Sequence, residues 1–322
     1  MKTVSIVIPT YNEEENVILM AETILKIFNN ELSKYNPEII FIDNCSEDNT
    51  KVLLKELCKK YSCIKCILNA KNFGPFNSPY YGILQSTGDC TILLAADFQD
   101  PVSLIIDFVR EWENGFKIVI GKKLSSKENK FMYFLRSVYY KLIKKMSDIE
   151  QIEHFTGFGL YDKEFVEILR QLKDPTPFLR GIVAELGYER KEISYQQEKR
   201  RAGKSSYSLY KLYDAAMLSF TSYTKIGLRL ATFMGLACSG ISLLVALIYL
   251  VYKLIYWNRF QAGTIPILLG IFIFGSLQLL FIGLLGEYIM NINTRIMNRP
   301  LVIEEERINF CNKEDTNTQE QR

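Results

Sequence analysis

The segment VSIVIPTYNEEEN, residues 4–16, decides the fold of the first half of the chain. It opens with an apolar run, which is typical of a strand buried inside a sheet. Turn-forming residues follow, and then come consecutive glutamates, which suit the first turn of a helix because the helix dipole favours negative charge there. Apolar side chains then recur at helical spacing as far as Ile27. The segment therefore predicts a strand, a loop and a helix, in that order.

The same alternation continues to residue 121. Further strands are expected at 38–42, 64–68, 91–94 and 117–121, and further helices at 47–61, 78–85 and 101–113. Alternating strands and helices predict an α/β domain built on a mostly parallel, Rossmann-like sheet with helices on both faces. Ligands of such sheets bind beyond the carboxyl ends of the strands.

Polar residues gather at those predicted strand ends. Asp43 follows one strand, Asp97 follows another, and the run Tyr11–Glu13 follows the first strand. A single carboxylate at such a place could be a helix cap. Carboxylates at successive strand ends are better explained by one shared site.

The stretch DFQDP, residues 97–101, carries the most chemistry. Asp97 and Gln99 offer hard oxygen ligands to Mg²⁺ or Mn²⁺. A divalent ion that bridges a diphosphate stabilises it as a leaving group. Asp100 is interpreted differently, as the N-cap of a helix that begins at Pro101.

Two uncharged runs, residues 230–252 and 260–286, dominate the second half. As helices, both are long enough to cross a hydrocarbon core of roughly 30 Å. Aromatic residues at 252, 256 and 257 lie where an interfacial belt would be. A pair of buried helices in a soluble core is the weaker alternative, so the sequence predicts two transmembrane helices.

Basic residues near the spans indicate the orientation. Two spans place both chain ends on one side, where Lys225, Arg229, Arg295 and Arg299 lie, against two basic residues in the connecting loop. This bias weakly favours a cytoplasmic catalytic domain. The odd number of cysteines, seven, and the lack of a secretory pattern also indicate a reducing compartment. The expected location is thus the cytoplasmic (inner) membrane, with a multi-pass topology.

The net charge of +3 argues against nucleic acid as a partner, because no general basic field is present.

Several ordered segments together resemble a known family. They are VSIVIPTYNEEENV at 4–17, FIDNCSEDNT at 41–50, NFGPFNSPYYGI at 72–83, AADFQDP at 95–101, FLRGIVAELGY at 178–188 and KRRAGKSSYSLYKLYD at 199–214. They resemble family 2 glycosyltransferases of the GT-A fold. With the two predicted spans, the run from about residue 2 to 303 is similar to the polyprenyl-phosphate glycosyltransferase branch, which includes bactoprenol glucosyltransferases and dolichol-phosphate mannose synthases.

The resemblance implies roles for the residues at the strand ends. Pro9, Tyr11 and Glu13 match the family's first nucleotide-contacting loop, and Asp43 matches the acid that holds the base or ribose. Asp97 matches the second acid of the DxD motif, which implies nucleotide, metal and catalytic roles.

The same comparison implies Mg²⁺ or Mn²⁺ as the cofactor, with Gln99 as a further metal ligand beside Asp97. Ala95 stands where the family has the first DxD acid, which puts the affinity for the metal in question.

A basic group is implied to hold phosphate. Arg136 and Arg200 match residues that bind phosphate groups of the donor or acceptor and are implied to be catalytic. Lys204 and Ser205 lie in the loop after Arg200 and are assigned to the acceptor phosphate. The cationic cluster from Lys199 to Lys204 also suits anionic lipid headgroups, and both interpretations stay open.

No general base is assigned. Some relatives carry an acid in the segment that here is TGFGL, residues 156–160. A lipid phosphate is already anionic and attacks directly once it is positioned, so in-line attack predicts inversion at the anomeric carbon.

The expected organisation is a GT-A domain at 1–204, an interfacial amphipathic helix at 205–225, spans at 226–256 and 263–290, and a cytoplasmic tail at 291–322. Helix 205–225 could equally pack on the catalytic domain. The tail beyond Ile303 is polar and is expected to be mobile.

The expected reaction moves a sugar from a nucleotide-diphosphate sugar, such as UDP-glucose, to undecaprenyl phosphate for use in a surface glycan. A homo-oligomer and a separate flippase are expected partners. The alternatives are a GDP-mannose-dependent synthase and a non-catalytic membrane scaffold, which Ala95 would favour. A processive polysaccharide synthase is less expected, because it needs more spans and a QxxRW-type segment.

Overall fold

The computed structural model describes residues 1–124, 152, 154–198, 201, 217, 221, 226–255 and 264–310. These residues belong to two compact units. One takes its described residues from Met1–Val138, Glu150–Ser208 and Asn298–Arg322, and the other from Tyr139–Ile149 and Leu209–Met297.

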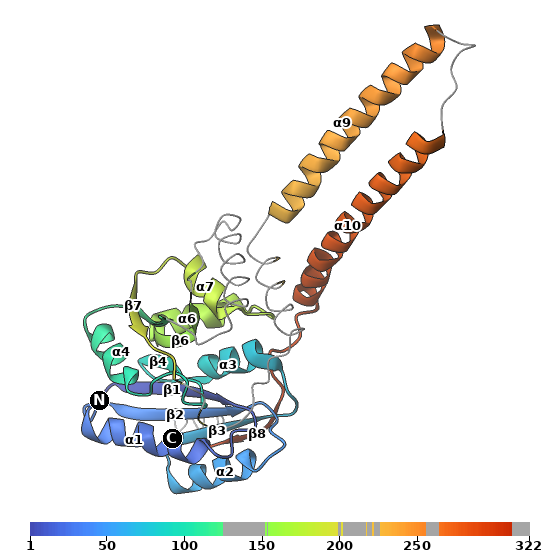
Figure 1. Cartoon of the computed structure of the whole chain (residues 1–322). Helices are drawn as coiled ribbons and strands as arrows, with labels where there is room; N and C mark the ends of the chain where they lie inside the picture. The colour runs from blue at the N-terminus through green and yellow to red at the C-terminus, as the bar shows by residue number, and fades with distance from the viewer. Residues whose placement is uncertain are drawn as a thin grey trace, which may run out of the picture. The chain divides into compact units, whose positions relative to one another are not determined.

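The first unit is built on an eight-stranded sheet of order β7-β5-β6-β4-β1-β2-β3-β8 (Figure 1). Its first four strands are parallel: β1 (Thr3–Thr10), β2 (Asn36–Asp43), β3 (Ile64–Asn69) and β4 (Cys90–Leu93). Each lies within two residues of a strand predicted from the sequence. This half of the α/β prediction is confirmed.

The other half of the sheet is mixed rather than mostly parallel. It contains β5 (Ile118–Lys123), β6 (Phe155–Asp162), β7 (Arg190–Tyr195) and β8 (Glu304–Ile308). Strand β6 runs antiparallel to both β4 and β5, whereas β7 is parallel to β5.

Helices cover both faces of the sheet (Figure 1). One face carries α1 (Val17–Asn30), α2 (Thr50–Lys60) and α4 (Leu104–Glu113). The opposite face carries α3 (Gly74–Gln85), α6 (Lys163–Leu172) and α7 (Leu179–Glu185).

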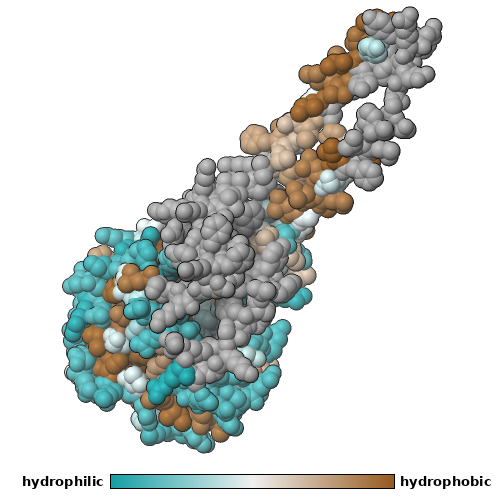
Figure 2. All heavy atoms as spheres, viewed as in Figure 1, coloured by the Kyte–Doolittle hydropathy of each residue, from teal (hydrophilic) through white to brown (hydrophobic). Residues whose placement is uncertain are grey.

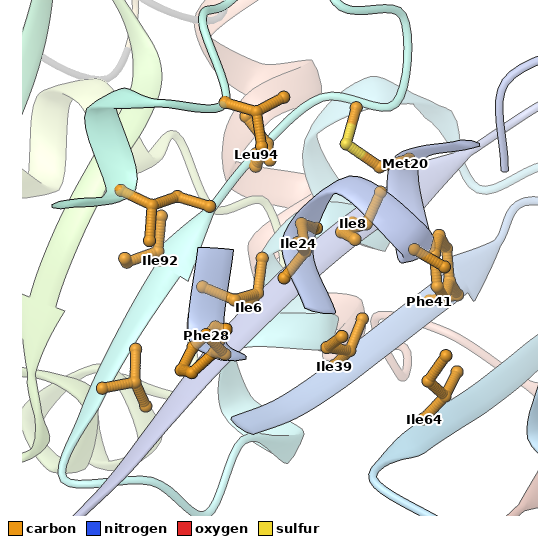
Figure 3. Packing of buried hydrophobic residues seen from close by; sticks show 14 of the residues in the cluster. Ile6, Ile8, Met20, Ile24, Phe28, Ile39, Phe41, Ile64, Ile92 and Leu94 are labelled. Atoms are coloured by element: carbon orange, nitrogen blue, oxygen red, sulfur yellow. The ribbon is translucent and has the colours of Figure 1, made fainter. Parts of the chain in front are cut away.

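Alternating side chains of β1 explain why both faces are covered. Ile6 and Ile8 point into the core under α1, where they meet Met20 and Ile24 (Figure 3). Val7, between them, belongs to the core of the other face. All five side chains are fully buried. A large aliphatic side chain contributes about 1.5–3 kcal/mol when it is fully buried, so a strand that is apolar on both faces is stable only between two helical layers.

Strand β8 corrects the expectation of a mobile tail beyond Ile303 for residues 304–310, and the rest of the tail lies outside the described residues. It pairs antiparallel with β3, and the Ala70 amide donates to the Ile303 carbonyl at 2.9 Å. Lys51 lies 3.1 Å from Glu305, and Lys55 forms an ion pair with Glu306. The polar composition suggested disorder, but an edge strand needs backbone partners more than apolar side chains.

The second unit contains two long helices, α9 (Ile226–Ile255) and α10 (Thr264–Met297), which contact each other. Figure 2 shows that their described surface is largely hydrophobic. Within the described residues, one stretch, Ile273–Met297, is long and apolar enough to cross a membrane. The predicted pair of spans is therefore supported directly for one helix only.

The expected interfacial helix at 205–225 lies outside the described residues, except for Met217 and Thr221.

Candidate active site

Asp43 organises the loop that follows β2. It is fully buried, and its carboxylate accepts hydrogen bonds from the backbone N–H of Ser46 at 2.9 Å and from the Ser46 hydroxyl. Burial raises the pKa of Asp43, while the Ser46 hydrogen bonds and the charge of Lys51 oppose this rise. The carboxylate therefore shapes its own loop.

The loop after β1 is fastened to this loop. Thr10 lies opposite Asp43 in the strand register. The Asn12 amide donates to the Ser46 hydroxyl oxygen at 2.9 Å, and the Glu13 amide donates to Thr50 Oγ1 at 2.9 Å. The loops after two neighbouring strands thus form one connected structure.

The other residues of the first loop that are predicted to contact the nucleotide lie beside this connection. The Glu13 carboxylate is buried and accepts a hydrogen bond from Asn16 Nδ2 at 2.6 Å. Pro9 and Tyr11 are half-buried at the end of β1 and in the turn after it.

Asp97 and Gln99 lie in the loop after β4, the neighbour of β1 on its other side. The Leu94 amide donates to the Val7 carbonyl at 3.0 Å, so this loop begins beside β1. The Asp97 carboxylate is buried and accepts a hydrogen bond from the Gln99 amide at 3.2 Å. The strand order therefore brings the Asp43 loop, the Tyr11–Glu13 loop and the Asp97 loop to adjacent positions on one edge.

Each of these three loops contains a residue with left-handed backbone: Asn12 (φ 56°), Cys45 (φ 62°) and Phe98 (φ 56°). Such conformations are uncommon outside glycine, and those of bulky residues gather at functional sites. Asparagine tolerates this region, but no sequence signal marks Phe98 or Cys45.

Sequence reasoning gave no role to Asn44, which ties in the loop after β3. Its side chain accepts a hydrogen bond from the Phe73 amide at 2.8 Å and donates to Asn72 Oδ1 at 3.0 Å and the Gly74 carbonyl at 3.2 Å. Asn44 directly follows Asp43, so the fourth strand-end loop is held by the same segment. The position of Asn44 directly after a strand is the sequence signal that could have identified it.

The interpretation of Asp100 as an N-cap is wrong. Helix α4 begins at Leu104, with Ser103 in the N-cap position. A turn precedes it, closed by a bond of 3.1 Å from the Leu104 amide to the Pro101 carbonyl. Asp100 instead accepts a hydrogen bond from the hydroxyl of Tyr195.

The donor set in the Asp97 loop fits Mg²⁺ or Mn²⁺. It consists of one carboxylate and one side-chain amide. Such ions commonly take one or two protein ligands and complete their coordination with substrate phosphates and water. No group of three or more His, Cys, Asp or Glu side chains suited to a metal occurs in the described part of the chain. Ala95 offers no side-chain ligand, so an ion bound in this loop would rely on Asp97 and Gln99.

The predicted phosphate-binding residues Arg136, Arg200, Lys204 and Ser205 lie outside the described residues. Their neighbour Arg201 is described, and its guanidinium lies 5.8 Å from the ring centre of Phe98.

Comparison with known proteins identifies the family of the chain. The model of the family "Glycosyl transferase family 2" matches residues 5–170. The chain is 30% identical over 301 residues to the SfII prophage-derived bactoprenol glucosyl transferase of Shigella flexneri, covering 93% of this chain and 96% of that protein. It is 27% identical over 301 residues to a prophage bactoprenol glucosyl transferase homolog of Escherichia coli, covering 93% and 97%.

Among solved structures, the chain is similar to glucosyl-3-phosphoglycerate synthase from Mycobacterium tuberculosis, crystallised with Mn²⁺, UDP and phosphoglyceric acid. The TM-score is 0.46 and the identity 15%, over 68% of this chain and 76% of that one.

The family model spans more than half of the 322 residues, and a relative at 30% identity spans nearly all of them. The resemblance inferred from the sequence is thereby confirmed: the chain belongs to glycosyl transferase family 2 and is a glycosyltransferase.

Proposed function

We propose that this chain transfers a sugar from a nucleotide-diphosphate sugar to undecaprenyl phosphate and yields a lipid-linked monosaccharide with inverted anomeric configuration. The observation that carries the proposal is the set of fastened loops at the ends of β1, β2 and β4, in a chain similar over almost its whole length to bactoprenol glucosyl transferases.

Different loops would bind different parts of the donor. Asp43 and the Tyr11–Glu13 loop face the nucleoside. Asp97 and Gln99 would hold a divalent ion, which supplies positive charge to the diphosphate as its bond to the sugar breaks. A rigid loop structure would help these residues to hold the donor in line with the acceptor, as the reaction requires.

The acceptor needs no protein base. A phosphate monoester of a polyprenol is anionic at neutral pH, so one of its oxygens attacks the anomeric carbon directly and inverts it. Arg136, Arg200, Lys204 and Ser205 are proposed to hold this phosphate near the membrane surface.

Two membrane spans are part of the proposal, and the strand order supports them. Strand β3 precedes both long helices and β8 follows them, yet the two strands are hydrogen-bonded neighbours. A chain that crosses a membrane between residues 69 and 304 would then have to cross it an even number of times. The stretch Ile273–Met297 provides one crossing, and the apolar α9 is the available second one.

This topology leaves the sheet unit on one side, which we place in the cytoplasm, where nucleotide sugars are made. The product must then be moved across the membrane by a separate flippase for use on a surface glycan. We further propose that the protein acts as a homo-oligomer.

The test is transfer of radiolabelled sugar to undecaprenyl phosphate by the purified full-length protein with Mg²⁺ or Mn²⁺. UDP-glucose, other UDP-sugars and GDP-mannose are compared as donors. We expect transfer from a UDP-sugar and a loss of about 100-fold or more in Asp97→Ala, because the charge that faces the diphosphate is removed. Transfer from GDP-mannose alone would replace the uridine donor. Folded protein that transfers no sugar from any donor would overturn the proposal.

A further inference from the structure

The Asp97 loop is joined to the end of β7 by a buried contact. Asp100 is only 6% exposed, and its carboxylate accepts a hydrogen bond from the hydroxyl of Tyr195, the last residue of β7. The ammonium group of Lys123, at the end of the neighbouring strand β5, lies 3.8 Å from the same oxygen. Buried polar groups of this kind are costly unless they are paired, so the contact is held firmly.

The joint extends beyond this one bond. The Glu198 amide donates to the Gln99 carbonyl at 3.0 Å, and Arg201 lies against the ring of Phe98. Phe98, Gln99 and Asp100 therefore contact Arg201, Glu198 and Tyr195 respectively, so the order of the partners along the chain is reversed. The two segments run side by side in opposite directions.

Packing fixes the ring that carries the hydroxyl. The Tyr195 ring meets Phe158 edge-on, with centroids 5.6 Å apart. It also lies over Gly121, where an added Cβ would be 3.0 Å from Tyr195 Cε1. The hydroxyl therefore has little freedom to follow a displaced Asp100.

Burial, together with the nearby Asp100 charge, raises the pKa of the Tyr195 hydroxyl. The hydroxyl therefore stays protonated at neutral pH and remains a hydrogen-bond donor.

We propose that Asp100 and Tyr195 are positioning residues that couple the loop of Asp97 and Gln99 to the end of β7 and to residues 196–198 after it. The left-handed backbone of Phe98, at the centre of that loop, persists only when its surroundings hold it. The Asp100–Tyr195 contact supplies that hold on one side. The inference rests on the proposed function in taking Asp97 and Gln99 as metal ligands.

Tyr195→Phe tests the coupling, because it removes the hydroxyl and keeps the ring. The measured quantity is Mn²⁺ binding by the full-length protein in detergent, followed from the free-ion electron paramagnetic resonance signal with UDP or GDP present and no sugar transfer. We expect binding to weaken by about tenfold or more, since tenfold is near the lower end of what a hydrogen bond to a charged group contributes. The rate of sugar transfer should fall as well.

Tyr80→Phe is the matched control. The Tyr80 side chain is also buried, and its hydroxyl donates a hydrogen bond of 3.1 Å to the Leu169 carbonyl, which joins α3 to α6. We expect its Mn²⁺ affinity to equal that of the unaltered protein, even if its thermal stability falls as much as that of Tyr195→Phe.

Several results would overturn the inference. One is unchanged Mn²⁺ affinity in Tyr195→Phe, and another is equal weakening in both tyrosine variants, which would indicate a general loss of packing. No Mn²⁺ binding by the unaltered protein with either nucleotide would also overturn it. Should Tyr195→Phe not fold, Asp100→Asn, which keeps the shape but not the charge, must weaken Mn²⁺ binding.

The inference and the proposed function fail separately. Sugar transfer by the unaltered protein, with Mn²⁺ affinity unchanged in Tyr195→Phe, would reject only the coupling. Weakened Mn²⁺ binding in Tyr195→Phe, without transfer to undecaprenyl phosphate by the unaltered protein, would reject only the proposed acceptor.

Discussion

Glu38 is a buried carboxylate at the amino end of the sheet, away from the strand ends that form the candidate site. It accepts hydrogen bonds from Lys65 at 2.6 Å, from the amide of Thr87 at 2.8 Å and its hydroxyl at 2.6 Å, and from the hydroxyl of Ser5. Burial alone would raise its pKa, but these donors together outweigh burial and lower the pKa. All the partners of the Glu38 carboxylate named here belong to the protein itself, and we therefore assign Glu38 a structural role, away from the candidate site.

The lowered pKa of Glu38 predicts a defined loss of stability in acid. A carboxyl whose pKa is lower in the folded state stabilises the fold above its unfolded-state pKa, about 4.5, and this contribution disappears as the pH falls through the folded value. We expect Glu38→Gln to lower the free energy of unfolding by about 1.5–3 kcal/mol at pH 7, because hydrogen bonds to a charged carboxylate are lost. The difference from the unaltered protein should shrink below about pH 4.5.

Thermal unfolding of the full-length protein in detergent, scanned from pH 7 to pH 3.5, measures this effect. Glu56→Gln on the exposed face of α2 is the control and should leave the melting temperature within about one degree, as surface changes usually do. A Glu38→Gln deficit that persists undiminished at pH 3.5 would contradict the explanation.

The residues of the candidate site differ in how far the sequence revealed them. Asp43 and Asp97 could be found because they directly follow apolar runs that were recognisable as strands. Asp100 was misassigned because a cap and a tertiary hydrogen bond require the same residue type. Its partner Tyr195 is 95 residues away, and no local pattern connects the two.

At the level of elements, burial decided what the sequence could predict. Strands β1 to β4 are apolar on both faces, so their runs stand out. Strand β8 has the sequence EEERI and places its side chains mainly at the surface, so its pairing depends on backbone bonds to β3. Helix α4 starts later than expected because Pro101 opens a turn rather than the helix itself.

The end of β8 is held by Asn309, which gives a test of that strand. Its Nδ2 donates to the carbonyls of Cys58 at 2.7 Å and Ile64 at 2.8 Å, and its φ of 63° is left-handed. Glycine tolerates this φ but lacks the side-chain amide. We expect Asn309→Gly to lower the free energy of unfolding by about 1–2 kcal/mol and to speed hydrogen exchange at the backbone N–H groups of β3 and β8.

Glu305→Gln is the contrasting variant, because its ion pair with Lys51 is partly exposed and such pairs contribute about 0–1 kcal/mol. Hydrogen exchange of the full-length protein in detergent compares the two. Faster exchange in Glu305→Gln than in Asn309→Gly would show that charge pairing, rather than Asn309, holds the strand.

At the scale of the whole molecule, strand pairing constrains the membrane topology more strongly than hydropathy does. Hydropathy identifies one candidate span among the described residues. A single crossing would put β8 on the opposite side of the membrane from β3, and the two could not share hydrogen bonds. The uncharged runs predict two spans from composition alone, and the pairing of β3 with β8 is an independent reason, visible only in the folded sheet, to expect an even number of crossings.

This constraint predicts a labelling pattern. Right-side-out membrane vesicles carrying Asn258→Cys or Glu305→Cys are treated with a membrane-impermeant thiol reagent, and the signal of the unaltered protein is subtracted. Residue 258 lies in the chain between α9 and α10, and residue 305 lies in β8. With two spans and a cytoplasmic sheet unit, position 258 should be labelled and position 305 protected until detergent is added. Labelling of 305 with protection of 258 would mean a single crossing or an inverted orientation. A third variant, Glu56→Cys on α2, distinguishes these two explanations. Position 56 would be labelled in an inverted orientation and protected with a single crossing.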